Sequence, residues 1–490
     1  MDQAPRPQLI GGRAVNARAS DRIVVENPAT GEPIGIVAAA GREDVALAVE
    51  AAGEAFDGWR WTPANERADL LHEAAARTIA RAPELVDALV REQGKARPEQ
   101  EEEVEWSANT LRYYAELGRN TRGRVVPSGE PRTQLNLVLH EPFGVVGAII
   151  PWNFPLLLLA WKLAPALAAG NTVVIKPSEL TPLVTLDWIS TCFEHFPAGV
   201  VNVVTGTGPG AGEALVAHPD VRVIAMTGSV ATGQRIATVA APMMKHVHLE
   251  LGGKDAFVVA GDATVAESVE ALAYAGLFNA GQVCTSAERI YVPARMHDDL
   301  VEALVERVGR IRVGDPAGDG IDMGPMAAER FRAKVADHVR DAVGRGAELV
   351  AGGDVPDGLE RGYFYAPTVL TGVDHDMVIM NEETFGPVLP VMPYDRIDDA
   401  IAWVNDSSMG LGATLRSSDP VLIKRFFEEV KVGTVWINDP LTDNYAGPFG
   451  GMKMTGGARE LGEEGLRSFL ETKHVHWDMS PDVKDYWYPY

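Results

Sequence analysis

Cysteine is scarce in this chain, since only Cys192 and Cys284 among its 490 residues carry a thiol. Two thiols cannot build the disulfide framework of a small secreted protein, and there is no CxxC pair that could hold zinc. The N-terminal stretch MDQAPRPQLIGGRAVNA contains no apolar run, so no secretory signal is visible. We therefore expect a cytoplasmic protein in a reducing compartment, without a metal site.

Positive charge is also scarce, because 44 Lys and Arg residues face 68 Asp and Glu residues, for a net charge of −24. This excess of acid argues against nucleic acid or an anionic membrane surface as a partner. An anionic ligand would need a locally positive or amide-rich site. A chain of this length is expected to form two or more domains.

One long stretch of the sequence carries no charged residue. It comprises the twenty residues from Pro142 to Trp161 and is long enough to cross a bilayer. Pro142, Pro151 and Pro155 interrupt this stretch and argue against a continuous helix. The pattern instead predicts a buried strand, a turn and then a helix, with no membrane span.

The order of apolar patterns predicts an α/β fold. A short β-rich start leads into helical patterns that last until about residue 120. Helices and strands then alternate, first LAWKLAPALAAG with NTVVIKPS and finally TGQRIATVAAPM with HVHLELGG. A second alternating block runs from DAFVVAG to about residue 465. Such alternation indicates βαβ units and parallel sheets covered on both faces.

Cys284 lies in the segment FNAGQVCTSAER, among small and polar residues. These neighbours favour an accessible sulfur, which as a thiolate would be a nucleophile. The alternative is an inert, buried side chain. Cys192 lies in an amphipathic helical pattern, and we interpret it as a packing residue.

Two glycine-bearing turns join strands to helices. TGTGPGA, at 205–211, fits the loose form of the dinucleotide fingerprint. MTGSVATG, at 226–233, offers backbone N–H groups and Ser229 to a pyrophosphate. Either turn could equally be a capped helix start without a ligand.

Two further side chains stand in unusual settings. Glu250 ends an apolar strand before two glycines, where a carboxylate is costly unless it is paired or used. Asn153 lies between two prolines in PWNFP and could donate to an oxyanion or merely close a turn.

Taken together, these segments resemble the aldehyde dehydrogenases. The resemblance runs in order along nearly the whole chain through PWNFP, KPSE, TGSVATG, ELGGKD, GQVCTSAER, EETFGPV and PFGGMKMTGGARELG. It implies oxidation of an aldehyde to a carboxylic acid. Cys284 would form a thiohemiacetal and then a thioester, Asn153 would stabilise the oxyanion, and Glu250 would activate water. Glu471 is where some relatives use a carboxylate to relay protons from the base.

The resemblance also implies NAD as cofactor. Lys176 and Glu179 would hold the adenosine ribose, and Glu383 the nicotinamide ribose, with Phe385 beside the ring. Because a carboxylate at Glu179 repels a 2′-phosphate, NADP is disfavoured. The full set of implied cofactor residues is Trp152, Lys176, Ser178, Glu179, Gly208, Gly228, Ser229, Gly233, Glu383 and Phe385.

The fold implied by the resemblance has a Rossmann-like NAD-binding domain from 1–120 and 142–253, and an α/β catalytic domain from 254–465. Residues 121–141 and 466–490 would form a small β flap for oligomerisation. The resemblance therefore predicts a homodimer or homotetramer, in which the flap covers an exposed sheet edge.

The substrate is less defined than the reaction. The implied tunnel is mostly apolar and aromatic, which suits medium-chain or aromatic aldehydes. Asp439 and Asp443 could instead attract a cationic aminoaldehyde, although we expect both to face solvent or shape a turn. An aminoaldehyde or semialdehyde dehydrogenase is thus the alternative. A coenzyme-A-acylating relative fits less well, since these often lack the base found here at Glu250. A cysteine hydrolase would need a histidine that these motifs do not contain.

Overall fold

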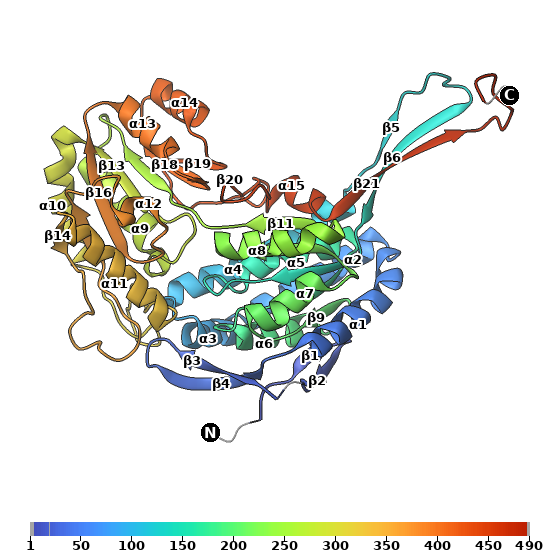
Figure 1. Ribbon diagram of the computed structural model, residues 1–490, viewed down its shortest axis with the longest axis horizontal. Coiled ribbons are helices and arrows are strands. Elements are labelled where there is room, and N and C mark those ends of the chain that lie inside the picture. Colours follow the sequence, from blue (N-terminus) through green and yellow to red (C-terminus); the bar gives the residue numbers. More distant parts are fainter. Residues whose placement is uncertain (1–3, 19, 488–490) are drawn as a thin grey trace.

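Two seven-stranded sheets form the centres of two lobes (Figure 1). The computed structural model describes residues 4–18 and 20–487. The first sheet has the order β11 (His246–Glu250), β10 (Val221–Thr227), β7 (Val145–Ile149), β8 (Thr172–Lys176), β9 (Val201–Val203), β1 (Gln8–Ile10) and β2 (Arg13–Val15). The second has the order β14 (Glu348–Ala351), β15 (Thr368–Thr371), β16 (Val388–Tyr394), β13 (Arg289–Pro293), β12 (Ala256–Val259), β18 (Gly412–Arg416) and β19 (Thr434–Ile437).

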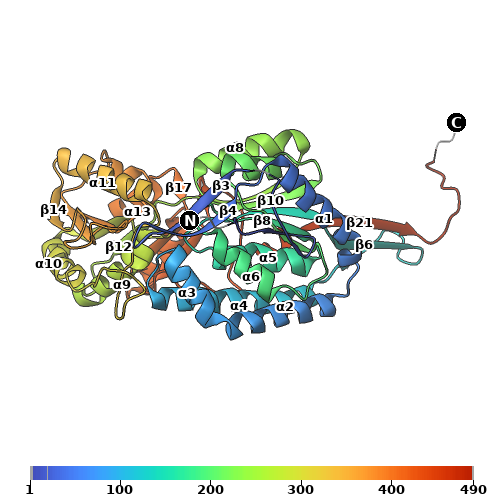
Figure 2. The same cartoon turned by 90° about the horizontal axis from the view of Figure 1, so that it is seen from below.

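Strands β7 to β11 pair in parallel. Every residue of β8, TVVIK, is buried, as expected for a parallel strand covered on both faces. Helices α5 and α8 lie on opposite sides of this sheet in Figure 2. The helices of the first lobe are α1 (Arg42–Arg60), α2 (Ala64–Ala80), α3 (Ala82–Glu92), α4 (Arg97–Arg119), α5 (Leu157–Ala169), α6 (Pro182–Cys192), α7 (Glu213–Ala217) and α8 (Val230–Ala240).

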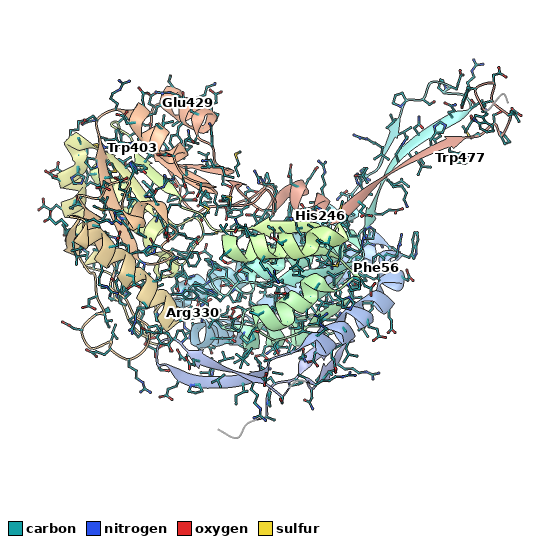
Figure 3. All side chains as sticks on the ribbon, in the orientation of Figure 1. Phe56, His246, Arg330, Trp403, Glu429 and Trp477 are labelled. Atoms are coloured by element: carbon teal, nitrogen blue, oxygen red, sulfur yellow. The ribbon has the colours of Figure 1, made fainter. Side chains whose placement is uncertain are left out.

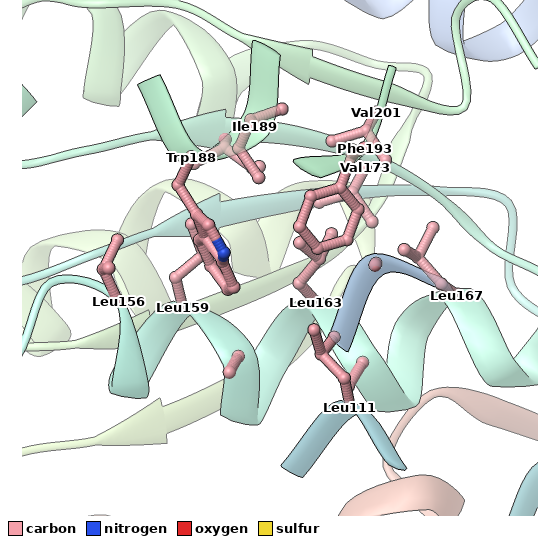
Figure 4. Packing of buried hydrophobic residues seen from close by; sticks show 14 of the residues in the cluster. Leu111, Leu156, Leu159, Leu163, Leu167, Val173, Trp188, Ile189, Phe193 and Val201 are labelled. Atoms are coloured by element: carbon pink, nitrogen blue, oxygen red, sulfur yellow. The ribbon is translucent and has the colours of Figure 1, made fainter. Parts of the chain in front are cut away.

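The core of the first lobe joins α5 to the sheet and to neighbouring helices. Leu159 and Leu163 of α5 lie beside Trp188 and Phe193 (Figure 4). Cys192 is fully buried in the same cluster, which confirms its interpretation as a packing residue. This continuous apolar cluster therefore supports the parallel strands of the first sheet.

The second lobe is also an α/β unit, with parallel pairing except at β14. Its helices are α9 (Val265–Leu277), α10 (His297–Val308), α11 (Glu329–Gly344), α12 (Val378–Asn381), α13 (Ile397–Asn405) and α14 (Pro420–Glu429). The predicted α/β fold is confirmed in both lobes.

Three shorter sheets complete the chain. A flap projects from the first lobe and consists of β21 (Leu470–Asp478), β6 (Gln134–Pro142) and β5 (Arg124–Val126) (Figure 1). The other two are the pairs β3 (Arg22–Asn27) with β4 (Glu32–Ala38), and β17 (Met409–Gly410) with β20 (Met452–Lys453). Helix α15 (Gly462–Arg467) precedes β21 and contacts α5.

The uncharged stretch 142–161 folds as a strand, a turn and a helix, as predicted. β7 ends at Ile149, the turn occupies 150–155, and α5 begins at Leu157. Within the described residues, no helix is both long and apolar enough to cross a membrane.

Candidate active site

Cys284 lies at the junction of two cavities. The larger, of about 290 Å³, opens on the side of α4 and α5, and the other, of about 190 Å³, lies between the lobes. Cys284 lines both. Its sulfur can therefore meet a small molecule on one side while a second molecule occupies the other.

A strained turn holds Cys284 in this position. Asn279, Ala280 and Gly281 have φ values of 52°, 53° and 71°, all in the left-handed region that non-glycine residues rarely adopt. The backbone N–H of Asn279 donates to Glu99 Oε1 at 3.0 Å, and its side-chain oxygen accepts from Gln93 Nε2 at 3.0 Å. These contacts fix the turn against α3 and α4.

The Cys284 thiol is partly buried. Burial raises its pKa well above the ordinary value, and the carboxylates of Asp255 and Glu383 raise it further. Since the thiolate is the nucleophilic form, a nucleophilic role for this sulfur would require that it first lose its proton.

Asn153 is buried in the turn before α5 and lines the second cavity. Its Nδ2 donates to the Gln282 carbonyl at 3.1 Å, which leaves its second N–H free for a ligand. Its backbone carbonyl accepts from Lys95 Nζ at 3.1 Å and from Asn279 Nδ2 at 3.2 Å. The amide is therefore held in place beside the segment that carries Cys284.

Glu250 ends β11 and is 3% exposed. Burial raises the pKa of its carboxyl well above the ordinary value, with a further contribution from Glu460. Its Oε1 has no hydrogen-bond partner among the described residues. The chain continues beyond the strand to Gly253, where an added Cβ would lie 2.3 Å from the Cys284 carbonyl oxygen. Glu250 lines neither cavity, so its side chain must turn to reach a water beside Cys284.

A buried ion pair between Lys162 and Glu460 lies beside Glu250, and we did not predict it from the sequence. Lys162 Nζ also donates to Thr227 Oγ1 at 2.6 Å. Burial acts to raise the pKa of Glu460, but Lys162 and His248 outweigh it, so the net shift is downward. The available signal was a single lysine within the apolar pattern LAWKLAPALAA.

Glu471, for which the resemblance implied a relay role, does not join this cluster. Its side chain is 49% exposed, and it pairs with Arg222 at 3.7 Å near the start of β10. Glu250 pairs with Thr227 at the other end of β10. Arg222 and Thr227 are five residue steps apart along the strand, about 16 Å. The carboxylate that lies near Glu250 is Glu460 instead.

The second cavity gathers most of the predicted nicotinamide-side residues. The Trp152 ring stacks on Phe331 with centroids 4.5 Å apart and meets Phe385 edge-on. Glu383 Oε1 accepts from the Gly253 N–H at 3.0 Å, and burial raises its pKa to about 7. The predicted residues that line this cavity are Trp152, Asn153, Gly228, Ser229, Cys284, Glu383 and Phe385.

Glu288 anchors this side of the site and was also not predicted. It accepts from the backbone N–H groups of Thr384 and Phe385 at 2.7 and 2.6 Å, and from Lys254 Nζ at 2.6 Å. It fixes Phe385, whose φ is 57°. The segment EETFGPV thus depends on a carboxylate from the cysteine motif.

The remaining predicted cofactor residues lie farther along the first lobe. Lys176 and Glu179 approach to 3.6 Å, and Arg330 of α11 reaches Glu179 at 3.9 Å. Ser178 Oγ accepts from the Leu180 N–H at 3.2 Å, so part of its role is to close the turn. Gly208 lines a separate cavity of about 310 Å³ next to α8. Gly233 packs on Leu251, where a Cβ would lie 2.6 Å from a methyl carbon.

These residues fit an NAD molecule. Ser229 accepts from Thr232 N at 3.3 Å and caps α8, an eleven-residue helix whose N-terminus favours a pyrophosphate. Carboxylates at Glu179 and Glu383 can accept from ribose hydroxyls. The motif TGTGPGA forms a π-helical turn at Gly208–Gly212. Among the described residues, no group of three His, Cys, Asp or Glu side chains could hold a metal.

The larger cavity has the aromatic and apolar lining that we predicted, including Phe154, Leu158, Trp161 and Phe449. Four carboxylates also line it, those of Glu99, Glu102, Glu103 and Asp443. Asp439 is exposed, whereas Asp443 is half-buried and lines the cavity.

Comparison with known proteins agrees with the resemblance seen in the motifs. The family model described as "Aldehyde dehydrogenase family" matches residues 15–475. The chain is 37% identical to betaine aldehyde dehydrogenase of Bacillus subtilis (strain 168), over 96% of this chain and 97% of that one. It is 39% identical to peroxisomal aminoaldehyde dehydrogenase 1 of Malus domestica, over 94% and 93%. The solved NAD+ complex of an aldehyde dehydrogenase from Bacillus cereus superposes with a TM-score of 0.95, at 37% identity and 97% coverage of both chains.

Proposed function

The chain belongs to the aldehyde dehydrogenase family, and from this premise we propose that Cys284 is the nucleophile in its NAD-dependent oxidation of an aldehyde to a carboxylic acid. The observation that supports this role is that Cys284 borders both cavities. An aldehyde entering through the larger cavity meets the sulfur from one side. The cofactor cavity meets it from the other.

In this mechanism the Cys284 thiolate attacks the carbonyl carbon and forms a thiohemiacetal. The free N–H of Asn153 and the Cys284 backbone N–H donate to the resulting oxyanion. NAD supplies the hydride acceptor. Glu250 takes a proton from water, which attacks the Cys284 thioester and releases the thiol and the acid. One aldehyde, one water and one NAD+ yield one carboxylic acid, one NADH and one proton, and a second proton leaves when the acid ionises.

The test is NADH formation from a generic aldehyde, followed at its near-ultraviolet absorbance. Cys284→Ala should abolish turnover and leave NAD binding intact, because the thiol bonds the aldehyde and not the cofactor. Glu250→Gln should allow a burst of NADH and then accumulate an acyl-enzyme, visible as a mass increase. Turnover near the wild-type rate in Cys284→Ala would remove the sulfur from the mechanism.

A specific observation favours an aldehyde that carries a positive charge. Glu99, Glu102 and Asp443 line the substrate cavity, and the nearby cation Lys95 is paired with Glu103 and acts at longer range on Glu99 and Glu102. Among the described residues, no Lys, Arg or His lines this cavity. Trp106, Tyr274 and other aromatic rings in the lining suit a cation equally well. The named relatives include betaine aldehyde and aminoaldehyde dehydrogenases, and one succinate-semialdehyde dehydrogenase from Arabidopsis thaliana.

The preference should depend on pH. Burial raises the pKa of Glu99 and of Asp443 to about 7 each. Both carboxyls are therefore charged above that pH and increasingly neutral below it. The KM of a quaternary ammonium aldehyde should fall as pH rises from about 6 to about 8. The KM of a neutral aldehyde of the same shape should change little.

Asp443→Asn should raise the KM of the quaternary ammonium aldehyde about tenfold and leave the neutral aldehyde unaffected. Asp439→Asn is the matched control, because Asp439 is exposed and does not line the cavity. A lower KM for an anionic semialdehyde than for the cationic aldehyde would overturn the preference without affecting the role of Cys284.

A further inference from the structure

Each turnover must export protons from a buried place. The thiol of Cys284 and the acid product each release one, and Glu250, which receives them, is 3% exposed. The ion pair of Lys162 with Glu460 is also buried, so it can receive a proton but cannot deliver it to water by itself. A route to solvent is therefore needed beyond Glu460.

Strand β11 carries three titratable side chains on one face. His246, His248 and Glu250 occupy alternate positions, and alternate residues of a strand point to the same side. His246 is exposed, whereas His248 is 2% exposed and Glu250 is 3% exposed. Successive members are about 7 Å apart along the strand. The row thus leads from the base to the surface.

Glu460 connects the inner two members. Its Oε1 lies 3.6 Å from His248 Nε2. Among the described residues, His248 Nε2, Glu460 Oε2 and Glu250 Oε1 have no hydrogen-bond partner. Buried polar atoms are rarely left unpaired, so these three atoms have hydrogen-bonding capacity to spare for one another or for a bridging water. A distance of 3.6 Å requires a small approach or a bridging water for transfer.

His246, which is labelled in Figure 3, is the exposed member of the row. Its ring stacks on Phe143 with centroids 5.2 Å apart. Burial lowers its pKa, His248 lowers it further, and Glu471 acts to raise it. Arg222 of β10 pairs with Glu471 at this end, while Lys162, Glu460 and Glu250 are the charged groups around His248. Because this net downward shift of the pKa favours the neutral ring, His246 readily gives up to water a proton that it receives.

We propose that His248 and His246 carry the protons of the reaction from Glu250 and Glu460 to solvent, an inference that rests on the proposed function. One proton moves from Glu250 to Glu460, then to His248, then through a bridging water to His246 and into solvent, with no change of oxidation state. His248 touches neither aldehyde nor sulfur. It is a positioning residue that accepts a proton through Glu460. Its packing at 5.6 Å from the Phe469 ring offers a purely structural alternative.

The experiment is a stopped-flow measurement of NADH absorbance and of a pH-indicator dye in the same weakly buffered reaction. In the wild type, proton release should keep pace with NADH formation. In His248→Gln the NADH burst should keep its amplitude, while proton release slows by at least about tenfold. In His246→Gln the same lag should appear and should disappear when imidazole is added, because the lost group is exposed.

Two comparisons separate this route from a structural role. His375→Gln removes a partly buried histidine that bonds Tyr291 in the other lobe, and proton release should keep pace there as in the wild type. If His248→Gln loses its burst amplitude through misfolding, the rescue of proton release by imidazole in His246→Gln tests the route instead. Proton release that keeps pace with NADH in both folded variants would overturn the route. Absence of NADH in the wild type would instead overturn the proposed function.

Discussion

At the scale of single residues, the state of the Cys284 thiol is the first question. Its pKa is raised by burial and by several carboxylates, so it should react slowly with iodoacetamide below about pH 9. A cationic nicotinamide in the neighbouring cavity would stabilise the thiolate. We predict that adding NAD speeds alkylation of Cys284 and moves the pH midpoint downward.

The measurement is the mass of the labelled protein as a function of time and pH. Cys284→Ala is the control, because the remaining Cys192 is fully buried and has its own pKa raised by burial. A midpoint that is the same with and without NAD would contradict this prediction.

Glu179 is expected to set the choice between NAD and NADP. A 2′-phosphate about 4 Å from its carboxylate would be repelled by roughly 4 kcal/mol at an effective dielectric of about 20. Lys176 and Arg330 both approach Glu179 and reduce this repulsion. One third of that repulsion energy still corresponds to about tenfold discrimination against NADP, so we expect a clear but incomplete preference for NAD.

Glu179→Ser should remove the repulsion and leave the two cations to attract the phosphate. We expect the kcat/KM ratio of NADP to NAD to rise about tenfold. Glu306→Ser, an exposed change on α10, is the control and should leave the ratio unchanged. Equal kcat/KM values of the wild type for NAD and NADP would show that the Glu179 carboxylate does not set the choice of cofactor.

At the scale of elements, the turn before Cys284 depends on one glycine. Gly281 has a φ of 71°, and a Cβ there would lie 2.1 Å from the Gly386 carbonyl oxygen. Gly281→Ala should therefore lower the free energy of unfolding by about 1–3 kcal/mol and reduce kcat by displacing the sulfur.

Thermal unfolding and kcat check this prediction against Gly53→Ala. Gly53 lies inside α1, and a Cβ there meets nothing within 4 Å. That variant should be stabilised by about 0.5–1 kcal/mol. Equal stability of the two variants would mean that the left-handed turn is not strained by a side chain.

The order of elements could be predicted, because it follows from contiguous patterns, and the resemblance of the motifs indicated that Cys284, Glu250 and Asn153 lie near one another. The motifs are turns and strand ends, whose residue types follow from local backbone needs. Glu460 and Glu288 could not be found this way, since each acts on a segment distant in the chain. The setting of Glu471 could not be predicted either, because sequence position does not reveal that Glu471 is half-exposed while Glu460 is buried near Glu250.

At the scale of the whole molecule, the flap formed by β5, β6 and β21 is a sheet with an edge that no other described strand of the chain covers. It projects away from both lobes in Figures 1 and 2, and Trp477 lies along it in Figure 3. Val125 is 67% exposed on β5, and Trp477 is 55% exposed on β21. Within the described chain, β5 pairs only with β6, so its other edge is open. An open apolar edge invites pairing with another strand.

We predict that this edge joins copies of the chain into a homodimer or homotetramer. The net charge of −24 makes such copies repel one another, so apolar burial and strand pairing must hold the assembly. Added salt screens the repulsion and should strengthen association. Light scattering should therefore give two or four times the 52.7 kDa chain mass, and the doubly charged variant Val125→Lys with Val126→Lys should shift the mass toward one chain. Val421→Lys, on the exposed face of α14, is the matched control and should stay assembled. A wild-type protein that is monomeric at all salt concentrations would show that the flap does not serve assembly.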